Sequence, residues 1–406
     1  MKFYKPEELK AGMRLAKQIY NKQGVLLYDR GSALTEPIIA SIQNFNLLGV
    51  LILEPSEPLP PISDEEREFE QLQTAYMFRL RDCLVAISKG KNPADFPALV
   101  SAIYDRFGTL DHRASFSQTI RSSEDYNYKH AVCLAILSAM TAHHLNFTPE
   151  AAGSLIAAAL LADFGYLYVP KPIMEKDEAD LSSTDLLSIE QYRTKAFQLL
   201  SQQTNPYGLS TDTFVALTEF LKVPRREDPE LDISSFHLNT KILMVVDKFD
   251  RMTAMSLNYE PVTSIKALRY LQQNKTLYDP SVVHAFSQAL QFLPAGQCVV
   301  LGSDLQGLVI DENPDDLFQP IVLDFKTNRL LDLSNPKLRA VLEINDLMTS
   351  MDRRYICDEE TLKQFVPDER LQATTRRIRL RLERAKKREA AKAARAAAAR
   401  SRQQGQ

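Results

Sequence analysis

The spacing of apolar residues in this 406-residue chain changes several times, and each change predicts a different kind of segment. Residues 13–19 (MRLAKQI) alternate as a strand does, and a glycine-containing turn leads to a second apolar run at 25–28. A short amphipathic stretch then precedes the apolar run 50–53. This pattern predicts a hairpin, a helix and a buried strand, which together form a small α/β module over residues 1–54.

A proline cluster separates that module from the next segment, with prolines at positions 55, 58, 60 and 61. Because proline lacks a backbone donor, we expect neither helix nor central strand there. From residue 64 to residue 292 the apolar positions recur at helical spacing, with helices expected at 64–89, from Pro97 and at 125–144. The spacing predicts one helical domain built around a single core.

The spacing changes again after Pro294. Residues 297–301, 308–310 and 320–323 predict three strands of a small antiparallel appendage over 293–334. Residues 335–406 are expected to be helical. The predicted fold is therefore mainly α, with a β-rich module before the helical domain and a β appendage after it.

The charge of the chain is distributed unevenly. The net charge is −3, yet residues 370–406 carry thirteen Lys and Arg against Glu383 and Glu389, which leaves the rest of the chain near −14. A solvated basic helix is one interpretation of this tail. Binding to nucleic acid, to an anionic membrane surface or to the acidic body of the protein are the alternatives.

Composition narrows the class of protein further. The longest apolar run, at 151–161, is too short to cross a bilayer, so we expect a cytoplasmic protein with no transmembrane segment. The four cysteines, Cys83, Cys133, Cys298 and Cys357, lie far apart without the paired spacing of a zinc or redox site. We expect them to be reduced and structural.

Three segments carry candidate chemistry. Residues 125–130 read DYNYKH before an apolar helix, residues 157–170 read AAALLADFGYLYVP, and residues 241–253 read KILMVVDKFDRMT. Their order and spacing resemble the core of the HD-GYP family, and the resemblance extends over roughly residues 120–330. It implies a helical HD-type domain.

The resemblance also implies a metal centre. In the family, two or three divalent metals held by histidines and carboxylates activate a water that attacks a phosphodiester, usually cyclic di-GMP. His130, Asp163 and Asp247 match three of the metal ligands.

Other family positions hold residues that cannot do this chemistry. Ala162 replaces the His of the His-Asp pair, Tyr166 replaces the Lys that binds phosphate, and Tyr192 replaces a later His. The paired histidines fall at Leu217 and Thr218, and the Gly-Tyr-Pro signature is absent from residues 223–228. No basic residue occurs at 255–259, where the family presents an Arg.

The sequence therefore favours a non-catalytic signalling or scaffold protein. We expect no cofactor. The expected partner is another protein or a component of a cyclic-dinucleotide pathway. One alternative is a phosphohydrolase with a reduced site, in which His130, Asp163 and Asp247 bind Mn or Mg weakly. In a purely structural interpretation, His130 is a buried residue paired with an aspartate, and Asp163 is a helix-end residue bound to backbone amides. Asp247 and Asp250 then form surface or half-buried ion pairs with Arg251.

Overall fold

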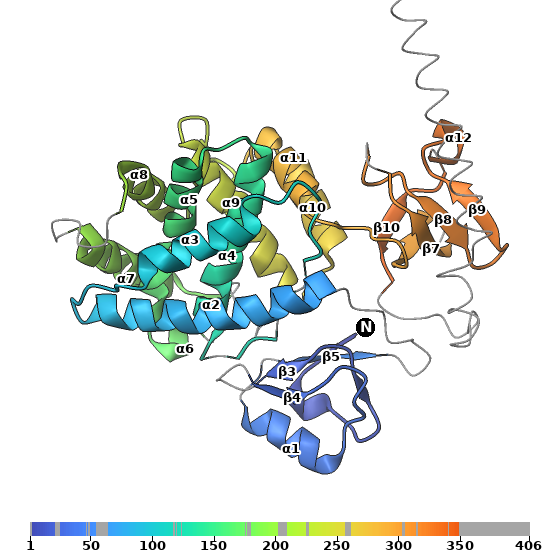
Figure 1. Cartoon of the computed structure of the whole chain (residues 1–406), viewed down its shortest axis with the longest axis horizontal. Coiled ribbons are helices and arrows are strands. Elements are labelled where there is room, and N and C mark those ends of the chain that lie inside the picture. Colours follow the sequence, from blue (N-terminus) through green and yellow to red (C-terminus); the bar gives the residue numbers. More distant parts are fainter. Residues whose placement is uncertain are drawn as a thin grey trace, which may run out of the picture. The chain divides into compact units, whose positions relative to one another are not determined.

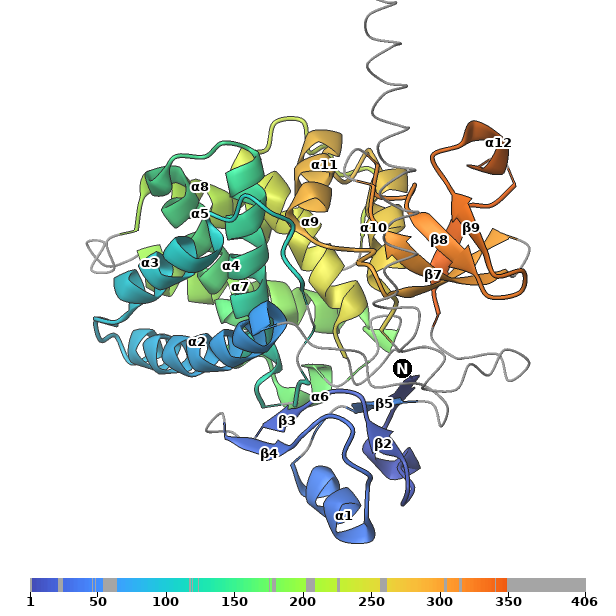
Figure 2. The same cartoon turned by 45° about the vertical axis from the view of Figure 1, so that its right-hand side comes forward.

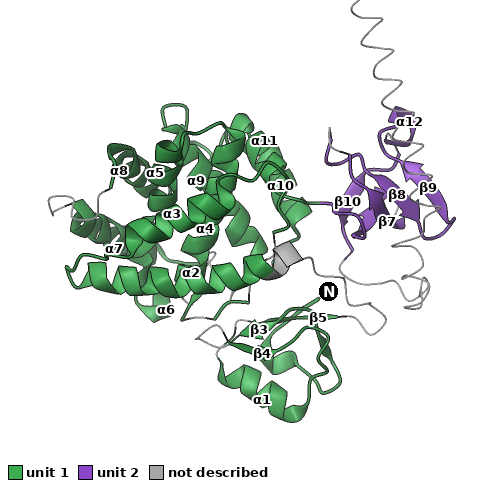
Figure 3. Ribbon diagram, in the orientation of Figure 1, with its two compact units in different colours: residues 1–292 green, residues 293–406 purple. Residues whose placement is uncertain are grey.

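In this computed structural model the chain divides into two compact units, residues 1–292 and 293–406 (Figure 3). The residues that the structure describes are 2–20, 25–45, 47, 49–53, 64–116, 118, 120–122, 124–174, 176, 180–201, 209–224, 227–255, 261–302, 305–313, 316–339 and 341–348. The predicted basic segment 370–406 lies outside them, as do Cys357 and most of the stretch 255–259.

In its described residues the amino-terminal module contains two small sheets, one α-helix and one short 3-10 helix. Antiparallel strands in the order β1-β5-β2 form one sheet, and β3 and β4 form a hairpin. The elements are β1 (Lys2–Tyr4), η1 (Pro6–Glu8), β2 (Arg14–Leu15), β3 (Ile19–Tyr20), β4 (Leu26–Tyr28), α1 (Glu36–Asn44) and β5 (Val50–Leu53).

The single strand predicted at 13–19 is wrong in one respect, because this segment is divided between the two sheets. Its first part, β2, pairs with β5, whereas β3 pairs with β4. Between them the chain bends at residues 16–17, where the Ala16 amide donates to the Leu51 carbonyl. The change of pairing partner interrupts the strand.

The helical part of the first unit surrounds α4, and α2, α3, α5, α9 and α11 all pack against this helix (Figures 1 and 2). Residues 130–142 of α4 are buried without exception, so this helix is buried on every face, as expected for the central helix of a core. The helices are α2 (Asp64–Ser88), α3 (Phe96–Phe107), α4 (Tyr126–His144), α5 (Pro149–Leu161), η2 (Phe164–Tyr168), α6 (Lys171–Met174), α7 (Ser183–Ser201), α8 (Thr211–Leu221), α9 (Leu238–Thr253), α10 (Ser264–Gln273) and α11 (Pro280–Ala289). The predicted mainly α fold with small β parts is confirmed.

The segment Pro149–Tyr168, which contains α5, is long and apolar enough to be a candidate membrane span. However, 72% of its apolar window is buried inside the structure. The core helix of a globular domain can have the same length and apolar composition, so these features alone are weak evidence for a membrane-spanning helix.

The amino-terminal module and the helical part share apolar packing within the first unit. The core of the module includes Ile120, which precedes α4, and Met255, which follows α9. Leu47 also forms a β-bridge with Ser122. The module therefore packs against the two segments that adjoin the ends of α4 and α9.

The second unit contains a five-stranded antiparallel sheet in the order β10-β6-β7-β8-β9. Its elements are β6 (Cys298–Leu301), β7 (Gln306–Asp311), β8 (Ile321–Asp324), β9 (Arg329–Asp332), α12 (Pro336–Arg339) and β10 (Ile344–Leu347). The helical segment predicted from residue 335 is wrong at β10, which pairs with β6 and buries Ile344. Four residues are too few to reveal a strand by their spacing.

Candidate functional site

His130 lies in the first turns of α4, where its imidazole is completely buried. Its Nδ1 lies 2.5 Å from Oδ2 of Asp250. Its Nε2 lies 3.0 Å from Oδ1 of Asp247 and 3.1 Å from Oδ2 of Asp163. The ring therefore contacts three carboxylates that come from the end of α5 and from α9.

The structure brings together the three ligands predicted from the sequence. One potential ligand atom from each of His130, Asp163 and Asp247 lies within 4.8 Å of the other two. Asp163 precedes η2, but its side chain does not cap that helix. It pairs with His130 and Arg251 instead, so the interpretation of Asp163 as a residue bound to backbone amides is wrong.

Asp163, Asp247 and Arg251 form the outer half of this network. Arg251 lies one turn after Asp247 on α9, so the two side chains share a face of the helix. Nε of Arg251 lies 2.9 and 3.0 Å from the two carboxylate oxygens of Asp247, and Nη2 lies 3.0 Å from Oδ2 of Asp163. The side chains of Asp247 and Arg251 are 18% and 21% exposed, so solvent reaches this half.

Asp250, Arg121 and Gln118 form the inner half. Nη2 of Arg121 donates to Oδ1 of Asp250 at 2.7 Å and to Oε1 of Gln118 at 3.0 Å. The Gln118 amide donates to the same oxygen of Asp250 at 2.8 Å. Asp250 and Arg121 have side-chain exposures of 0%, so the surface or half-buried ion pair expected for Asp250 is in fact completely buried.

The formal charges of the network cancel when His130 is protonated. Burial and Arg251 lower the pKa of His130, but hydrogen bonds to the three aspartates outweigh them and raise it well above its usual range. Burial raises the pKa values of Asp163 and Asp250, yet neighbouring cations hold both well below their usual range: Arg251 and His130 for Asp163, and Arg121 and His130 for Asp250. With His130 protonated, three carboxylates face three cations, which is the condition for burying so many charges together.

We tested whether these residues fit a divalent metal. One imidazole and two carboxylates are suitable donors for Mn²⁺ or Zn²⁺. In this structure, however, Arg251 already donates to both carboxylates, and Nε2 of His130 faces Asp247 and Asp163 at hydrogen-bond distance. The donor types fit a metal, but the arrangement of the residues does not.

The family positions that are substituted in the sequence hold side chains that pack in the core or bond locally. Ala162, Tyr166 and Leu217 are buried, and Tyr166 packs in an apolar cluster with Tyr192 at its edge. Thr218 is exposed, and its hydroxyl donates to the Phe214 carbonyl within α8. The side chains at these positions therefore serve packing or local helix structure.

Tyr166 is nevertheless close to the outer half. Gly165 allows η2 to lie close against α7, since a Cβ at that position would lie 2.5 Å from Cα of Arg193. The guanidinium carbons of Arg251 and Arg193 each lie 5.7 Å from the centre of the Tyr166 ring. An aromatic ring stabilises nearby cations through its quadrupole.

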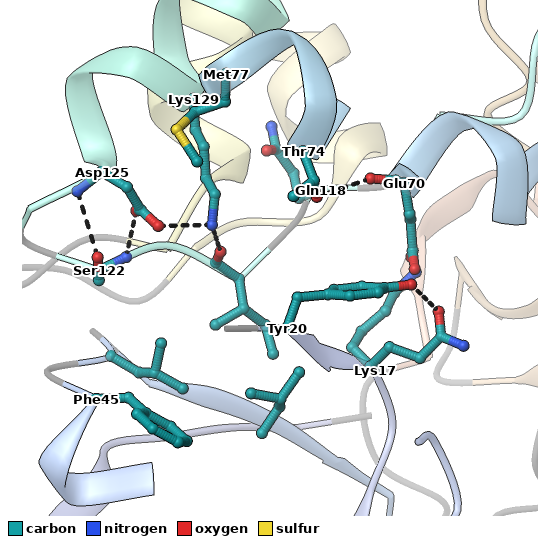
Figure 4. A pocket seen from close by; sticks show the side chains of 14 residues that line it. Lys17, Tyr20, Phe45, Glu70, Thr74, Met77, Gln118, Ser122, Asp125 and Lys129 are labelled. Atoms are coloured by element: carbon teal, nitrogen blue, oxygen red, sulfur yellow. Dashed lines mark hydrogen bonds and ion pairs between the residues drawn. The ribbon is translucent and has the colours of Figure 1, made fainter. Parts of the chain in front are cut away.

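A small pocket adjoins the inner half, where β3, α2 and the segment before α4 meet (Figure 4). Gln118 lines it, together with Tyr20 and Phe45 from the amino-terminal module. Its charged groups are paired: Lys17 with Glu70 at 3.2 Å, and Lys129 with Asp125 at 2.8 Å. The pocket links the module to Gln118 and presents no strong excess of either charge.

Comparison with known proteins supports the resemblance. No protein-family profile matches the chain. A cyclic di-GMP phosphodiesterase of Pseudomonas aeruginosa is 24% identical over 211 residues, which cover 52% of this chain and 50% of that enzyme. The chain contains an HD-GYP-like domain. It spans about half the length of the curated relative that it matches.

A solved HDG"Y"P protein from Bdellovibrio bacteriovorus has a TM-score of 0.42 and 13% identity with this chain, over 70% of this chain and 97% of that protein. The sequence similarity relates the HD-GYP-like domain to a cyclic di-GMP phosphodiesterase.

Sequence reasoning missed the inner half of the HD-GYP-like site. Asp250 was predicted only as a surface or half-buried partner of Arg251. Asp250 and Arg251 follow Asp247 by three and four residues, so all three lie near one face of a helix, and this spacing could have placed Asp250 beside His130. Arg121 and Gln118 gave no such signal, since they lie in an irregular segment before α4.

Proposed function

We propose that this chain is a non-catalytic HD-GYP-like protein that acts as a scaffold or receptor in cyclic-dinucleotide signalling. The observation that supports this most directly is the pairing of both outer carboxylates, Asp163 and Asp247, with Arg251. Hydrolysis of a phosphodiester by this family of sites requires a metal-activated water and a second cation on the phosphate. Here the chain's own guanidinium neutralises the carboxylates that would hold the metal.

The missing donors argue in the same direction. A bridging pair of metals needs more ligands than one imidazole and two carboxylates provide. Ala162 and Leu217 present only hydrocarbon, and Tyr192 packs at the edge of an apolar cluster. A second metal would therefore lack protein ligands on the side where the family supplies histidines.

The alternative function is a metal-dependent phosphohydrolase with a reduced site. The convergence of His130, Asp163 and Asp247 within 4.8 Å favours it, because the same three atoms can meet around one ion if Arg251 moves away. A single weakly held Mn²⁺ or Mg²⁺ is then the expected cofactor.

A turnover assay separates the two functions. Purified protein is incubated with cyclic di-GMP and Mn²⁺, and linear product is followed by chromatography beside an Asp163→Asn variant. We expect both proteins to form linear product only at the background rate, so that the cyclic di-GMP stays intact. If the protein is a receptor for cyclic di-GMP, equilibrium dialysis should also show that it retains the intact nucleotide. Multiple turnovers in the wild type that Asp163→Asn abolishes would establish the phosphohydrolase instead.

The partner surface is a further part of the proposal. Residues 370–406 carry the excess of Lys and Arg that would bind a phosphate-rich surface, in a protein that we propose to be cytoplasmic. Binding of RNA, DNA or anionic vesicles is compared between the whole chain and a chain ending at residue 369. A tail that neutralises phosphates must lose affinity steeply as salt rises, and binding that is insensitive to the truncation contradicts this role.

A further inference from the structure

We infer that Arg251 is an internal cation that excludes divalent metal from a latent site formed by His130, Asp163 and Asp247. The inference rests on the proposed non-catalytic function and identifies the residue responsible for it. It concerns a side chain on α9 rather than the substituted family positions at the C-cap of α5 and on η2, α7 and α8.

The first support is the geometry of the carboxylates. Arg251 donates to both oxygens of Asp247 at 2.9 and 3.0 Å and to Oδ2 of Asp163 at 3.0 Å. A metal shared by these carboxylates would need an oxygen of each at about 2.0–2.2 Å. The guanidinium and the ion therefore compete for the same lone pairs and for the same position between two negative charges.

Tyr166 gives the second support. It stands where the family has the Lys that binds phosphate, and its ring centre lies 5.7 Å from the guanidinium carbon of Arg251. A lysine at this position would place another cation beside Arg251 and Arg193, whereas an aromatic ring attracts them. The ring of Tyr166 therefore helps to keep the guanidinium of Arg251 over the cluster.

A buried carboxylate oxygen gives the third support. Oδ1 of Asp163 has no hydrogen-bond partner among the described residues, although Oδ2 of the same carboxylate pairs with His130 and Arg251. Buried carboxylate oxygens normally accept a hydrogen bond or bind an ion. Oδ1 of Asp163 can thus accept a hydrogen bond or bind a cation, and a latent ion site needs such an oxygen.

The donor set selects the probe. Two carboxylates and one imidazole, completed by water, suit Mn²⁺, whose paramagnetism makes free and bound ion distinguishable. Arg251→Ala removes the competing charge, Arg251→Met removes the charge but keeps the packing of the side-chain stem, and Arg251→Lys keeps the charge. Asp163→Asn in the Arg251→Ala background removes one ligand of the proposed site.

The experiment is a Mn²⁺ titration followed by electron paramagnetic resonance, with circular dichroism of each variant to establish folding. Because a unit charge in contact with the site is removed, we expect Arg251→Ala and Arg251→Met to bind one Mn²⁺ at least about tenfold more tightly than the wild type. Arg251→Lys should stay close to the wild type, and the added Asp163→Asn should remove the gain. Either charge-removing variant is sufficient if the other fails to fold.

The contrary outcomes are distinct. Folded Arg251→Ala and Arg251→Met proteins that bind Mn²⁺ no better than the wild type overturn the role of Arg251 and leave the non-catalytic function standing. An Arg251→Lys protein that gains as much affinity as Arg251→Ala shows that charge is not the cause, which also overturns the inference. A wild type that already binds Mn²⁺ tightly and turns over cyclic di-GMP overturns both proposals.

Discussion

The inner and outer halves of the network around His130 use the same chemistry in different surroundings. In each half an arginine pairs with an aspartate of α9 that also contacts the imidazole. Arg121 and Asp250 have 0% side-chain exposure, whereas Arg251 and Asp247 are 21% and 18% exposed. The same pairing should therefore contribute differently to stability and to function.

The difference indicates separate roles for the two arginines. If Arg121 moved away from Asp250, an unpaired charge would remain in the core, and this would lower the stability of the fold. Arg251 can be replaced by water or by an ion, because solvent already reaches its carboxylate. We therefore regard the inner half as part of the folded core and the outer half as the part that decides whether a metal enters.

The largest expected effect is that of Arg121→Met. Removing one partner of a completely buried pair should lower the free energy of unfolding by about 3–5 kcal/mol, because Asp250 is left uncompensated. Urea denaturation measures the change, with Arg251→Met as the matched control and a smaller expected loss. Equal losses for the two variants would break the distinction between the halves.

Acidification should produce the next largest effect. The pKa values of Asp163 and Asp250 are lowered in the folded state, so their contribution to stability is present above the unfolded value of 3.8 and is lost as the pH falls through the folded values. We expect the free energy of unfolding to decrease steeply below about pH 4, and less steeply in Arg121→Met. Urea denaturation across pH measures both slopes, and parallel slopes would show that Arg121 does not lower the pKa of Asp250.

Gln118→Leu should have a smaller effect that is confined to the inner half. The amide donates to Asp250 and accepts from Arg121, so its loss should cost about 1–3 kcal/mol. Gln118 also donates to the hydroxyl of Thr253, and Thr253→Val is the control for that bond. A Gln118→Leu protein as stable as the wild type would show that Gln118 is not part of the buried network.

The smallest expected effect is the coupling between Tyr166 and Arg251. A double-mutant cycle with Tyr166→Leu and Arg251→Met should give an interaction energy of about 0.5–1 kcal/mol, typical of a cation near an aromatic ring. Additive losses in thermal or urea unfolding would mean that the ring does not hold the guanidinium.

The sequence predicted the outer half better than the inner half for a physical reason. His130, Asp163 and Asp247 lie on regular helices or at their ends, where order and spacing determine which side chains meet. Arg121 and Gln118 reach Asp250 from an irregular segment more than a hundred residues away, and no periodicity reports such a contact. The helical domain was likewise predictable from long periodic segments, whereas the division of 13–19 and the strand β10 involve runs of two to four residues.

Elemental analysis of the purified wild-type chain, after incubation with Mn²⁺ and Fe²⁺ and removal of unbound ion, tests the central claim most directly. If Arg251 excludes metal from His130, Asp163 and Asp247, the protein retains far less than one equivalent of metal per chain. The Asp163→Asn variant then retains the same small amount. One or two retained ions per chain that disappear in Asp163→Asn would contradict the account.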